Sequence, residues 1–253
     1  MSSEDKRVIL VTGSNSGIGY ETVKVLAKKG HIVYLSARKE AAGKEAQQKL
    51  KKEDGLDVKF VHLDVTDIKS VEAARDTIDK EEGRLDVLVH NGAISAMDKD
   101  QNATTVDLAT IREVFEPNFF GLVQTTTTLL PLLRKAAKAN PGYTVICVNT
   151  IDMASGTLQS GPNALPHVVA YNTSKAAVNS YTIALAVALK GEGIKVNCVT
   201  PNFTTTKLNG YHPGGNKVED SGKFLAEWSL LGPGPEDEGK TCLFWSPSGQ
   251  FPW

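Results

Sequence analysis

The chain has 253 residues, and its 28 Lys and Arg are balanced by 29 Asp and Glu, which leaves a formal net charge of -1. This balance gives no bulk electrostatic reason to bind nucleic acid or an anionic membrane, so we exclude both as partners and expect a small molecule instead. The length suits one α/β domain over residues 1–253.

The polar N-terminus and the lack of a long apolar run predict a cytoplasmic protein. Residues 1–7 lead directly into an apolar strand pattern and lack the apolar core of a secretory signal. No segment reaches the roughly 20 uninterrupted apolar residues that a membrane span needs. The cysteines Cys147, Cys198 and Cys242 lie far apart and the histidines are scattered, so we predict buried thiols and no metal site.

Short β-branched runs alternate with longer amphipathic segments along the chain. We predict strands at residues 8–11, 32–35, 58–61, 85–89, 144–148, 194–199 and 241–245, and helices at 17–29, 41–53, 70–82, 110–139, 169–190 and 217–231. Strands that are apolar on both faces and joined by helical crossovers form a parallel sheet covered on both sides. We therefore expect a single doubly wound α/β domain with a parallel, seven-stranded sheet.

A glycine cluster stands between the first predicted strand and the first predicted helix. Residues 12–19 read TGSNSGIG. Glycines here permit a tight turn and a close backbone approach, and the helix N-terminus offers N–H groups to a pyrophosphate. The pattern predicts a dinucleotide site, although an ordinary glycine-rich turn is the alternative.

The residues after the second predicted strand indicate which dinucleotide is bound. The chain reads SARK at 36–39, without the Asp or Glu that takes the ribose hydroxyls of NAD. The planar guanidinium of Arg38 can instead pair with a 2′-phosphate, which favours NADP(H). The alternative is an exposed arginine with a structural role only.

Tyr171 and Lys175 are spaced so that both lie on one face of the predicted helix 169–190. A tyrosine with a pKa of about 10 is a poor acid or base near neutrality, and a neighbouring ammonium favours its phenolate. Such a pair arises often by chance. Because this pair follows the glycine turn and Arg38 in the order typical of a dinucleotide enzyme, we interpret Tyr171 as a proton-transfer residue.

Over nearly its whole length the chain resembles the short-chain dehydrogenase/reductase family. The resemblance is carried by TGSNSGIG at 12–19, LDV at 63–65, NGA at 91–93, NFFG at 118–121, YNTSK at 171–175, and Pro201. The patterns at 239–241 and 252–253 look most like the NADPH-dependent carbonyl reductase branch. The resemblance implies a Rossmann fold and reversible, NADP(H)-dependent reduction of a ketone or aldehyde to an alcohol.

The resemblance also assigns residues to the site. The catalytic group that it implies is Asn118, Thr150, Tyr171 and Lys175. In this group Tyr171 protonates the developing alkoxide, Lys175 lowers the pKa of Tyr171, and Asn118 holds a relay water. Together with Arg38, the implied cofactor-binding residues are Gly13, Asn15, Ser16, Ile18, Gly19, Asp64, Val65, Asn91, Tyr171, Lys175, Pro201, Thr204 and Thr206.

Several positions depart from the family pattern. The family reads Asn-Asn-Ala-Gly where this chain has HNGA at 90–93, and Asn202 replaces a glycine after Pro201. Pro117 should kink or break the helix 110–139. Thr150 stands where the family has the serine that donates a hydrogen bond to the carbonyl oxygen, and Ser155 is its competitor for that role.

We expect residues 155–168 to form a substrate-edge loop and residues 204–231 a lid over a lipophilic substrate, although a surface loop without substrate contact is the alternative for 155–168. Two other functions stay open: a redox-neutral isomerase or cyclase, and an NADPH-sensing regulator without turnover. The intact Tyr171 and Lys175 argue against the regulator. The substrate, the reaction direction and the oligomeric state, whether monomer, dimer or tetramer, are not fixed by the sequence.

Overall fold

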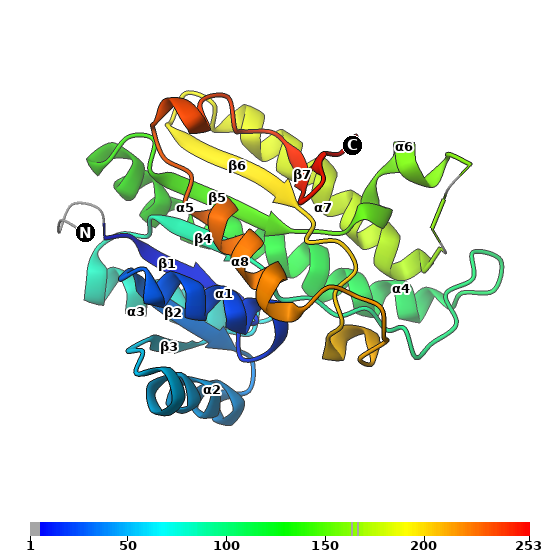
Figure 1. The fold of residues 1–253 in the computed structure, drawn as a ribbon, viewed down its shortest axis with the longest axis horizontal. Helices are drawn as coiled ribbons and strands as arrows, with labels where there is room; N and C mark the ends of the chain where they lie inside the picture. Colours follow the sequence, from blue (N-terminus) through cyan, green and yellow to red (C-terminus); the bar gives the residue numbers. More distant parts are fainter. Residues whose placement is uncertain (1–5, 163, 166) are drawn as a thin grey trace.

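A computed structural model describes residues 6–162, 164–165 and 167–253, and these residues build one sheet between two layers of helices (Figure 1). The strand order is β3-β2-β1-β4-β5-β6-β7-β8, with β1 to β7 parallel and β8 antiparallel to β7. The doubly wound fold is confirmed, and β8 adds a short eighth strand to the seven that were predicted. The strands are β1 (Val8–Val11), β2 (Ile32–Ala37), β3 (Lys59–His62), β4 (Val87–His90), β5 (Thr144–Asn149), β6 (Ile194–Val199), β7 (Phe244–Ser246) and β8 (Gly249–Gln250).

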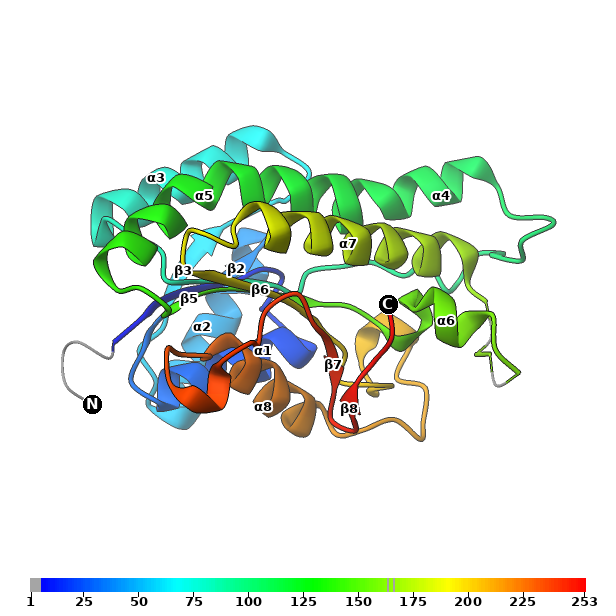
Figure 2. The same cartoon turned by 90° about the horizontal axis from the view of Figure 1, so that it is seen from above.

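Figure 2 shows the two helical layers from the side. One face of the sheet is covered by α3 (Ile68–Glu82), α4 (Leu108–Phe115), α5 (Gly121–Ala139) and α7 (Val169–Ala188). The other face is covered by α1 (Gly17–Lys28), α2 (Glu40–Asp54) and α8 (Val218–Ser229). Shorter helical elements are η3 (Asp152–Ala154), α6 (Gly156–Gln159), η4 (Lys207–Asn209) and η5 (Pro235–Asp237).

The strands are buried on both faces, which explains their continuous apolar runs. Val8 and Leu10 of β1 belong to the core under α3, α5 and α7, whereas Ile9 and Val11 belong to the core under α1 and α8. Alternation of side chains along a strand sends neighbours to opposite faces. The first strand therefore contributes to two cores at once.

The helix predicted over residues 110–139 does not break at Pro117. Between α4 and α5 lies a π-helical segment, η2 (Glu116–Phe120), in which the N–H of Gly121 donates to the carbonyl of Glu116. Proline lacks an N–H and its ring crowds the preceding turn, so the wider π turn accommodates Pro117 within a continuous helix. The expected kink or break is thus a π segment, and Asn118 lies buried inside it.

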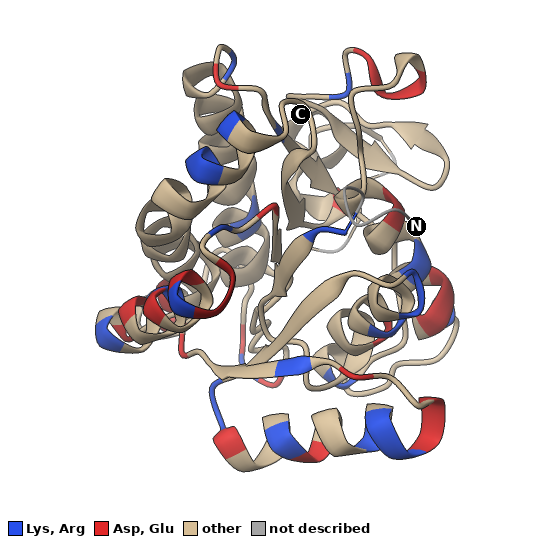
Figure 3. Cartoon of the chain, turned by 90° about the vertical axis from the view of Figure 1, so that its left-hand side faces the viewer, with Lys and Arg blue, Asp and Glu red and all other residues tan. Residues whose placement is uncertain are grey.

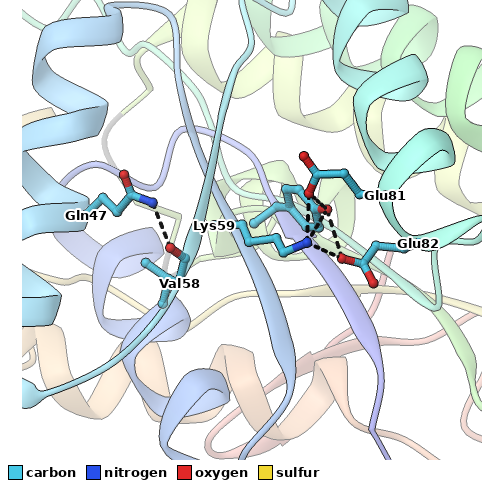
Figure 4. Close-up of polar contacts among 6 residues, drawn as sticks. Gln47, Val58, Lys59, Glu81 and Glu82 are labelled. Carbon is cyan, nitrogen blue, oxygen red and sulfur yellow. Dashed lines mark hydrogen bonds and ion pairs between the residues drawn. The ribbon is translucent and has the colours of Figure 1, made fainter.

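Hydrogen bonds and ion pairs connect α2 and α3 to β3 and to the residue before it, at one edge of the sheet (Figure 4). Gln47 of α2 donates to the carbonyl of Val58 at 2.8 Å. Lys59 forms ion pairs with Glu81 at 2.7 Å and Glu82 at 2.5 Å, near the end of α3. These contacts lie away from the carboxyl ends of the strands, and we assign them a structural role.

Charges of both signs are interspersed on the outer helices, whereas the strands carry few of them (Figure 3). α2 shows this mixture most clearly, because lysines and acidic residues alternate along its outer surface. The lysines at 49, 51 and 52 therefore belong to a solvated helix.

Candidate active site

Two turns meet where the strand order reverses, between the carboxyl ends of β1 and β4. The Thr12 hydroxyl accepts the N–H groups of Asn91 and Gly92, both at 3.0 Å, and so joins the turns. Gly13 has a φ of 57°, and a Cβ placed there would lie 2.6 Å from the Cα of Gly92. The altered motif at 90–93 thus leaves a well-joined turn at the crevice where doubly wound sheets bind ligands.

The N-terminus of α1 faces this crevice. Its N-cap residue Ser16 makes no side-chain cap hydrogen bond, so the first-turn N–H groups have no capping side chain and suit an anion. Gly13, Asn15, Ser16 and Ile18 line a cavity of about 850 Å³ here. Gly19 lies behind the turn, where a Cβ would come within 2.4 Å of the Asn91 amide nitrogen.

The far end of the cavity carries the residues expected to bind the adenine nucleotide. Arg38, which follows β2, is exposed and lines the cavity. Its main-chain carbonyl bonds the His62 ring nitrogen Nε2 at 3.0 Å, whereas its guanidinium takes part in no hydrogen bond or ion pair within the described ranges. Although burial opposes it, hydrogen bonds from Thr66 and the charge of Arg38 lower the pKa of the Asp64 carboxyl. Val65 also lines the cavity, as does Lys39, which sequence reasoning did not select.

Tyr171 and Lys175 lie in the first turns of α7 and both line the cavity. Each side chain is only 4% exposed. The Lys175 ammonium donates to the main-chain carbonyl of Asn149 at 3.0 Å. The predicted pair therefore shares one face of the helix and one cleft with the glycine turn.

Burial dominates the electrostatics of this pair. It raises the pKa of the Tyr171 hydroxyl, and the negative charge of Asp152 raises it further. Burial also lowers the pKa of Lys175 to about 8. The pKa of Tyr171 is thus raised by its surroundings rather than lowered by Lys175 as the resemblance implies, and a protonated hydroxyl suits a proton donor.

Asn149 is a site residue that sequence reasoning missed. Its amide donates to the Asn91 side-chain oxygen at 3.1 Å, and Asn91 in turn donates to the carbonyls of Thr12 and Gly13. Because Lys175 binds the carbonyl of the same Asn149, one residue links the glycine turn to the catalytic lysine. Its own side-chain oxygen is buried without a partner among the described groups, and could accept a hydrogen bond from a ligand in the cleft.

Thr150 and Ser155 are separated by the structure. Thr150 directly follows β5, lines the cavity, and donates its hydroxyl proton to Asn179 of α7 at 2.9 Å. The Ser155 hydroxyl instead accepts the N–H of Leu158 as the N-cap of α6. Of the two hydroxyls, that of Thr150 stands on the cleft side.

Asn118 lies outside the residues that line the cavity. Its side chain accepts the N–H of Ile94 at 2.9 Å and donates to the Ile94 carbonyl and the Ser174 hydroxyl. Both of its amide protons are thereby used within the protein. The amide fixes the loop after β4 to the π segment, and its role in holding a relay water stays a prediction.

The residues after β6 divide between the cavity and its surroundings. Thr206 lines the cavity. Thr204 is buried and bonds the Ser221 hydroxyl at 2.7 Å, whereas Pro201 lines a separate hollow beneath α8. Thr204 and Pro201 thus shape the loop that carries Thr206, and their predicted contacts with the cofactor are not visible in the cavity lining.

His90, at the end of β4, replaces an asparagine of the family pattern. Its ring nitrogen Nε2 bonds the Thr126 hydroxyl at 2.8 Å. Burial, followed by the charge of Lys175, lowers the pKa of His90 to about 3. The ring is therefore neutral and joins β4 to α5.

No three His, Cys, Asp or Glu residues come together to hold a metal ion within the described ranges. In the same part of the chain, no helix combines the length and the apolar character that crossing a bilayer requires.

Comparison with known proteins agrees with this geometry. A model of the short chain dehydrogenase family matches residues 7–214. The short-chain dehydrogenase anuI of Penicillium roqueforti is 30% identical over 100% of both chains. A bovine (Bos taurus) carbonyl reductase named as using NADPH is 38% identical over 62% of this chain and 56% of its own length. The chain belongs to the short-chain dehydrogenase/reductase family, whose members include carbonyl reductases.

Solved structures show the same fold. The NADPH-bound carbonyl reductase from chicken fatty liver has a TM-score of 0.82 at 25% identity and covers 98% of this chain and 94% of its own. The carbonyl reductase Sniffer of D. melanogaster has a TM-score of 0.84 at 24% identity over 98% of this chain and 100% of its own, which is evidence for the fold alone. The chain is thus an oxidoreductase of this family acting between carbonyl and alcohol groups.

Proposed function

We propose that this protein is an NADPH-dependent reductase of a lipophilic ketone or aldehyde. The observation that carries the proposal is the shared cleft, in which Tyr171 and Lys175 of α7 stand beside the glycine turn after β1. The carboxyl ends of the strands hold all of these groups on rigid elements. Such preorganisation is what hydride and proton transfer to one carbonyl group require.

The residues present fit the nicotinamide dinucleotide. Gly13, Asn15, Ser16 and Ile18 would hold its phosphates, Asp64 and Val65 its adenine, and Asn91 and Lys175 its riboses. When bound, the reduced cofactor supplies hydride to the carbonyl carbon. Thr206, which lines the cavity, would offer its hydroxyl to the cofactor's carboxamide.

Protein side chains complete the reduction. The Tyr171 hydroxyl, whose pKa is raised by burial, stays protonated at neutral pH and donates its proton to the developing alkoxide. Thr150 stands in the same cleft to orient the carbonyl oxygen, and a bound substrate would draw its proton away from Asn179. Lys175 is anchored by the carbonyl of Asn149 and would hold the cofactor's ribose beside Tyr171.

The preference for NADPH over NADH is proposed from Arg38, whose exposed guanidinium makes no hydrogen bond or ion pair in the described ranges. The residues at 36–39 after β2 also include no Asp or Glu for the ribose hydroxyls of NADH. Arg38→Ala should raise the KM for NADPH at least tenfold, about the effect of one charged hydrogen bond, while the KM for NADH changes little. Steady-state kinetics with both cofactors measures this. If the substitution changed the KM for NADPH and the KM for NADH equally, Arg38 would not be the residue that recognises the 2′-phosphate.

The lipophilic substrate is proposed from the rim of the cleft. The segments that follow β4, β5 and β6 carry exposed large apolar side chains, namely Met97, Leu158, Leu165, Phe203, Leu208 and Tyr211, and of these Leu208 lines the cavity. The loops are joined, because the Ser95 hydroxyl donates to the carbonyl of Leu208 at 2.7 Å. An exposed apolar rim around a polar site suits an apolar ligand, with residues 155–168 and 204–231 as its edge loop and lid.

The function is tested by following NADPH consumption with a panel of lipophilic and polar ketones and aldehydes. We expect oxidation of NADPH with formation of the alcohol, fastest for the lipophilic carbonyls. A rearranged product without NADPH consumption would support an isomerase or cyclase instead. NADPH binding without turnover of any compound would support a regulator.

A further inference from the structure

Asn179 is a buried amide that bonds the side chain of Thr150. It lies in α7, four residues after Lys175 and therefore one turn further along the same face of the helix. Its side-chain oxygen accepts the Thr150 hydroxyl proton at 2.9 Å, and both side chains are buried. Thr150 lines the cavity and Asn179 does not, so of the two only Thr150 can meet a ligand there.

The amide nitrogen of Asn179 has no hydrogen-bond partner in the described ranges, although it is fully buried. Buried donors nearly always have an acceptor, because an N–H group that leaves water without another partner is costly to bury. The amide thus offers Thr150 its oxygen and holds an unused NH2 group on the other side of the same short side chain.

The single hydroxyl proton of Thr150 is needed in two places. In the structure it goes to Asn179, whereas the proposed reaction requires it at the carbonyl oxygen of the substrate. If Thr150 turned this proton to the substrate and the amide stayed as it is, two oxygen atoms would face each other at 2.9 Å with no hydrogen between them. Such an arrangement is repulsive, because both atoms present lone pairs.

We propose that Asn179 is a positioning residue, whose amide makes a half-turn about its Cβ–Cγ bond when the carbonyl substrate binds. The buried NH2 group then donates to the Thr150 oxygen, and Thr150 donates its own proton to the substrate. The half-turn exchanges two groups of nearly the same size, so it needs no movement of α7. The inference rests on the proposed reductase function and adds to it the residue that directs the Thr150 proton.

A double-mutant cycle tests the proposal with Asn179→Leu, made in the wild type and in Thr150→Ala. Leucine has a similar size and no hydrogen-bonding group. The control is Asn172→Leu, because Asn172 is a second buried asparagine of α7 and neither polar atom of its side chain has a partner in the described ranges. For each variant, kcat for a lipophilic ketone and the KM for NADPH are measured.

In the wild-type background Asn179→Leu should lower kcat about tenfold, the rate equivalent of one hydrogen bond, and should leave the KM for NADPH within about twofold. In the Thr150→Ala background the same substitution should change kcat less than about twofold, because the hydroxyl that it positions is already gone. Asn172→Leu should leave kcat unchanged. An equal loss of kcat in both backgrounds would mean that Asn179 only supports the helix, and either that result or an unchanged kcat in the wild-type background overturns the proposal.

The side-chain amide protons of Asn179 report the half-turn in NMR spectra of the wild type, where their signal is assigned by its loss in Asn179→Leu. Adding a lipophilic ketone in excess to the protein saturated with NADP⁺ should move one of these protons downfield, because it gains an acceptor, and should not move it in Thr150→Ala. A wild-type signal that stays in place overturns the proposal. A signal that moves with ketones of which none is reduced by NADPH would refute the reductase function and still support the assignment of Asn179.

Discussion

The chemistry open to each buried polar group at the site depends on which of its hydrogen-bonding atoms have a partner and which do not. The Lys175 ammonium is held by one carbonyl and forms no ion pair with a carboxylate of the described residues, so its burial is costly. Thr150 is held by Asn179, whose own amide nitrogen is buried without a partner in the described ranges. Such uncompensated groups are expected where function takes precedence over stability.

The first prediction concerns the choice between Thr150 and Ser155. Thr150→Ala should lower kcat by about 10²- to 10³-fold, the usual loss for one oxyanion donor, whereas Thr150→Ser keeps the hydroxyl and should be tolerated. Ser155→Ala should cost about 1 kcal/mol of stability through the lost N-cap and leave kcat nearly unchanged. Steady-state kinetics and denaturation of the three variants check this. If Ser155→Ala lowered kcat strongly and Thr150→Ala lowered it only slightly, the assignment of Thr150 rather than Ser155 as the donor would be wrong.

The second prediction concerns the stability cost of Lys175. Its pKa in the folded chain, about 8, lies below the ordinary 10.5. Between these values the unfolded chain binds more protons than the folded one, so the cost is fully present below pH 8 and is lost as the pH rises toward 10.5. Lys175→Met should therefore raise the free energy of unfolding at pH 7 by about 2 kcal/mol, allowing for the lost hydrogen bond.

Urea denaturation of wild type and Lys175→Met without cofactor, at neutral pH and again near pH 10, measures this difference. The advantage of the variant should shrink at the higher pH. A variant no more stable than the wild type at pH 7, or an advantage independent of pH, would show that burial of Lys175 carries no such cost.

At the scale of elements, the site depends on how closely two turns approach each other. Gly13 and Gly17 both have positive φ, 57° and 61°. A Cβ at Gly13 would meet the backbone of Gly92 at 2.6 Å, whereas a Cβ at Gly17 would meet only the Thr206 methyl at 3.9 Å. An alanine at either position would therefore adopt the same strained left-handed backbone. Only at position 13 would its methyl group also collide with a neighbouring backbone.

The third prediction uses this matched pair. Both Gly13→Ala and Gly17→Ala should lose about 1–2 kcal/mol of stability from the left-handed backbone, and Gly13→Ala should lose about 1–3 kcal/mol more because its methyl separates the turns. The free energies of unfolding of the two variants measure the difference. Equal losses would mean that the approach of Gly13 to Gly92 is not tight.

Periodicity predicted the regular elements well, because strands buried on both faces read as continuous apolar runs. It failed where tertiary contacts decide the structure. β8 exists only by pairing with β7, and α6 lies within a segment predicted as a loop. At Pro117 the sequence predicts that an α-helix cannot continue unchanged, but it does not predict the π turn, in which Asn118 accepts a hydrogen bond from the distant Ile94.

Local sequence motifs predicted part of the candidate site. Tyr171, Lys175 and the glycine turn are recognisable from spacing within one element. Asn149 was missed because it acts through a main-chain carbonyl toward α7 and a side chain toward β4, which no local pattern reveals.

At the scale of the whole molecule, one edge of the sheet carries the proposed function and the rest supports it. The carboxyl ends of β1, β2, β4 and β5 and the start of α7 converge on one cavity, while charged contacts such as those of Lys59 lie elsewhere (Figure 4). The cytoplasmic location and the oligomeric state stay predictions.

The central claim is that Tyr171 donates the proton in an NADPH-dependent carbonyl reduction, and Tyr171→Phe tests it most directly. The substitution removes one hydroxyl that makes no hydrogen bond to another described residue, so the cofactor site should be preserved. We predict that kcat for a lipophilic ketone falls by about 10²- to 10⁴-fold, while the Kd for NADPH, measured by calorimetry, changes less than about twofold. Turnover comparable to that of the wild type, with NADPH still bound, would contradict the account.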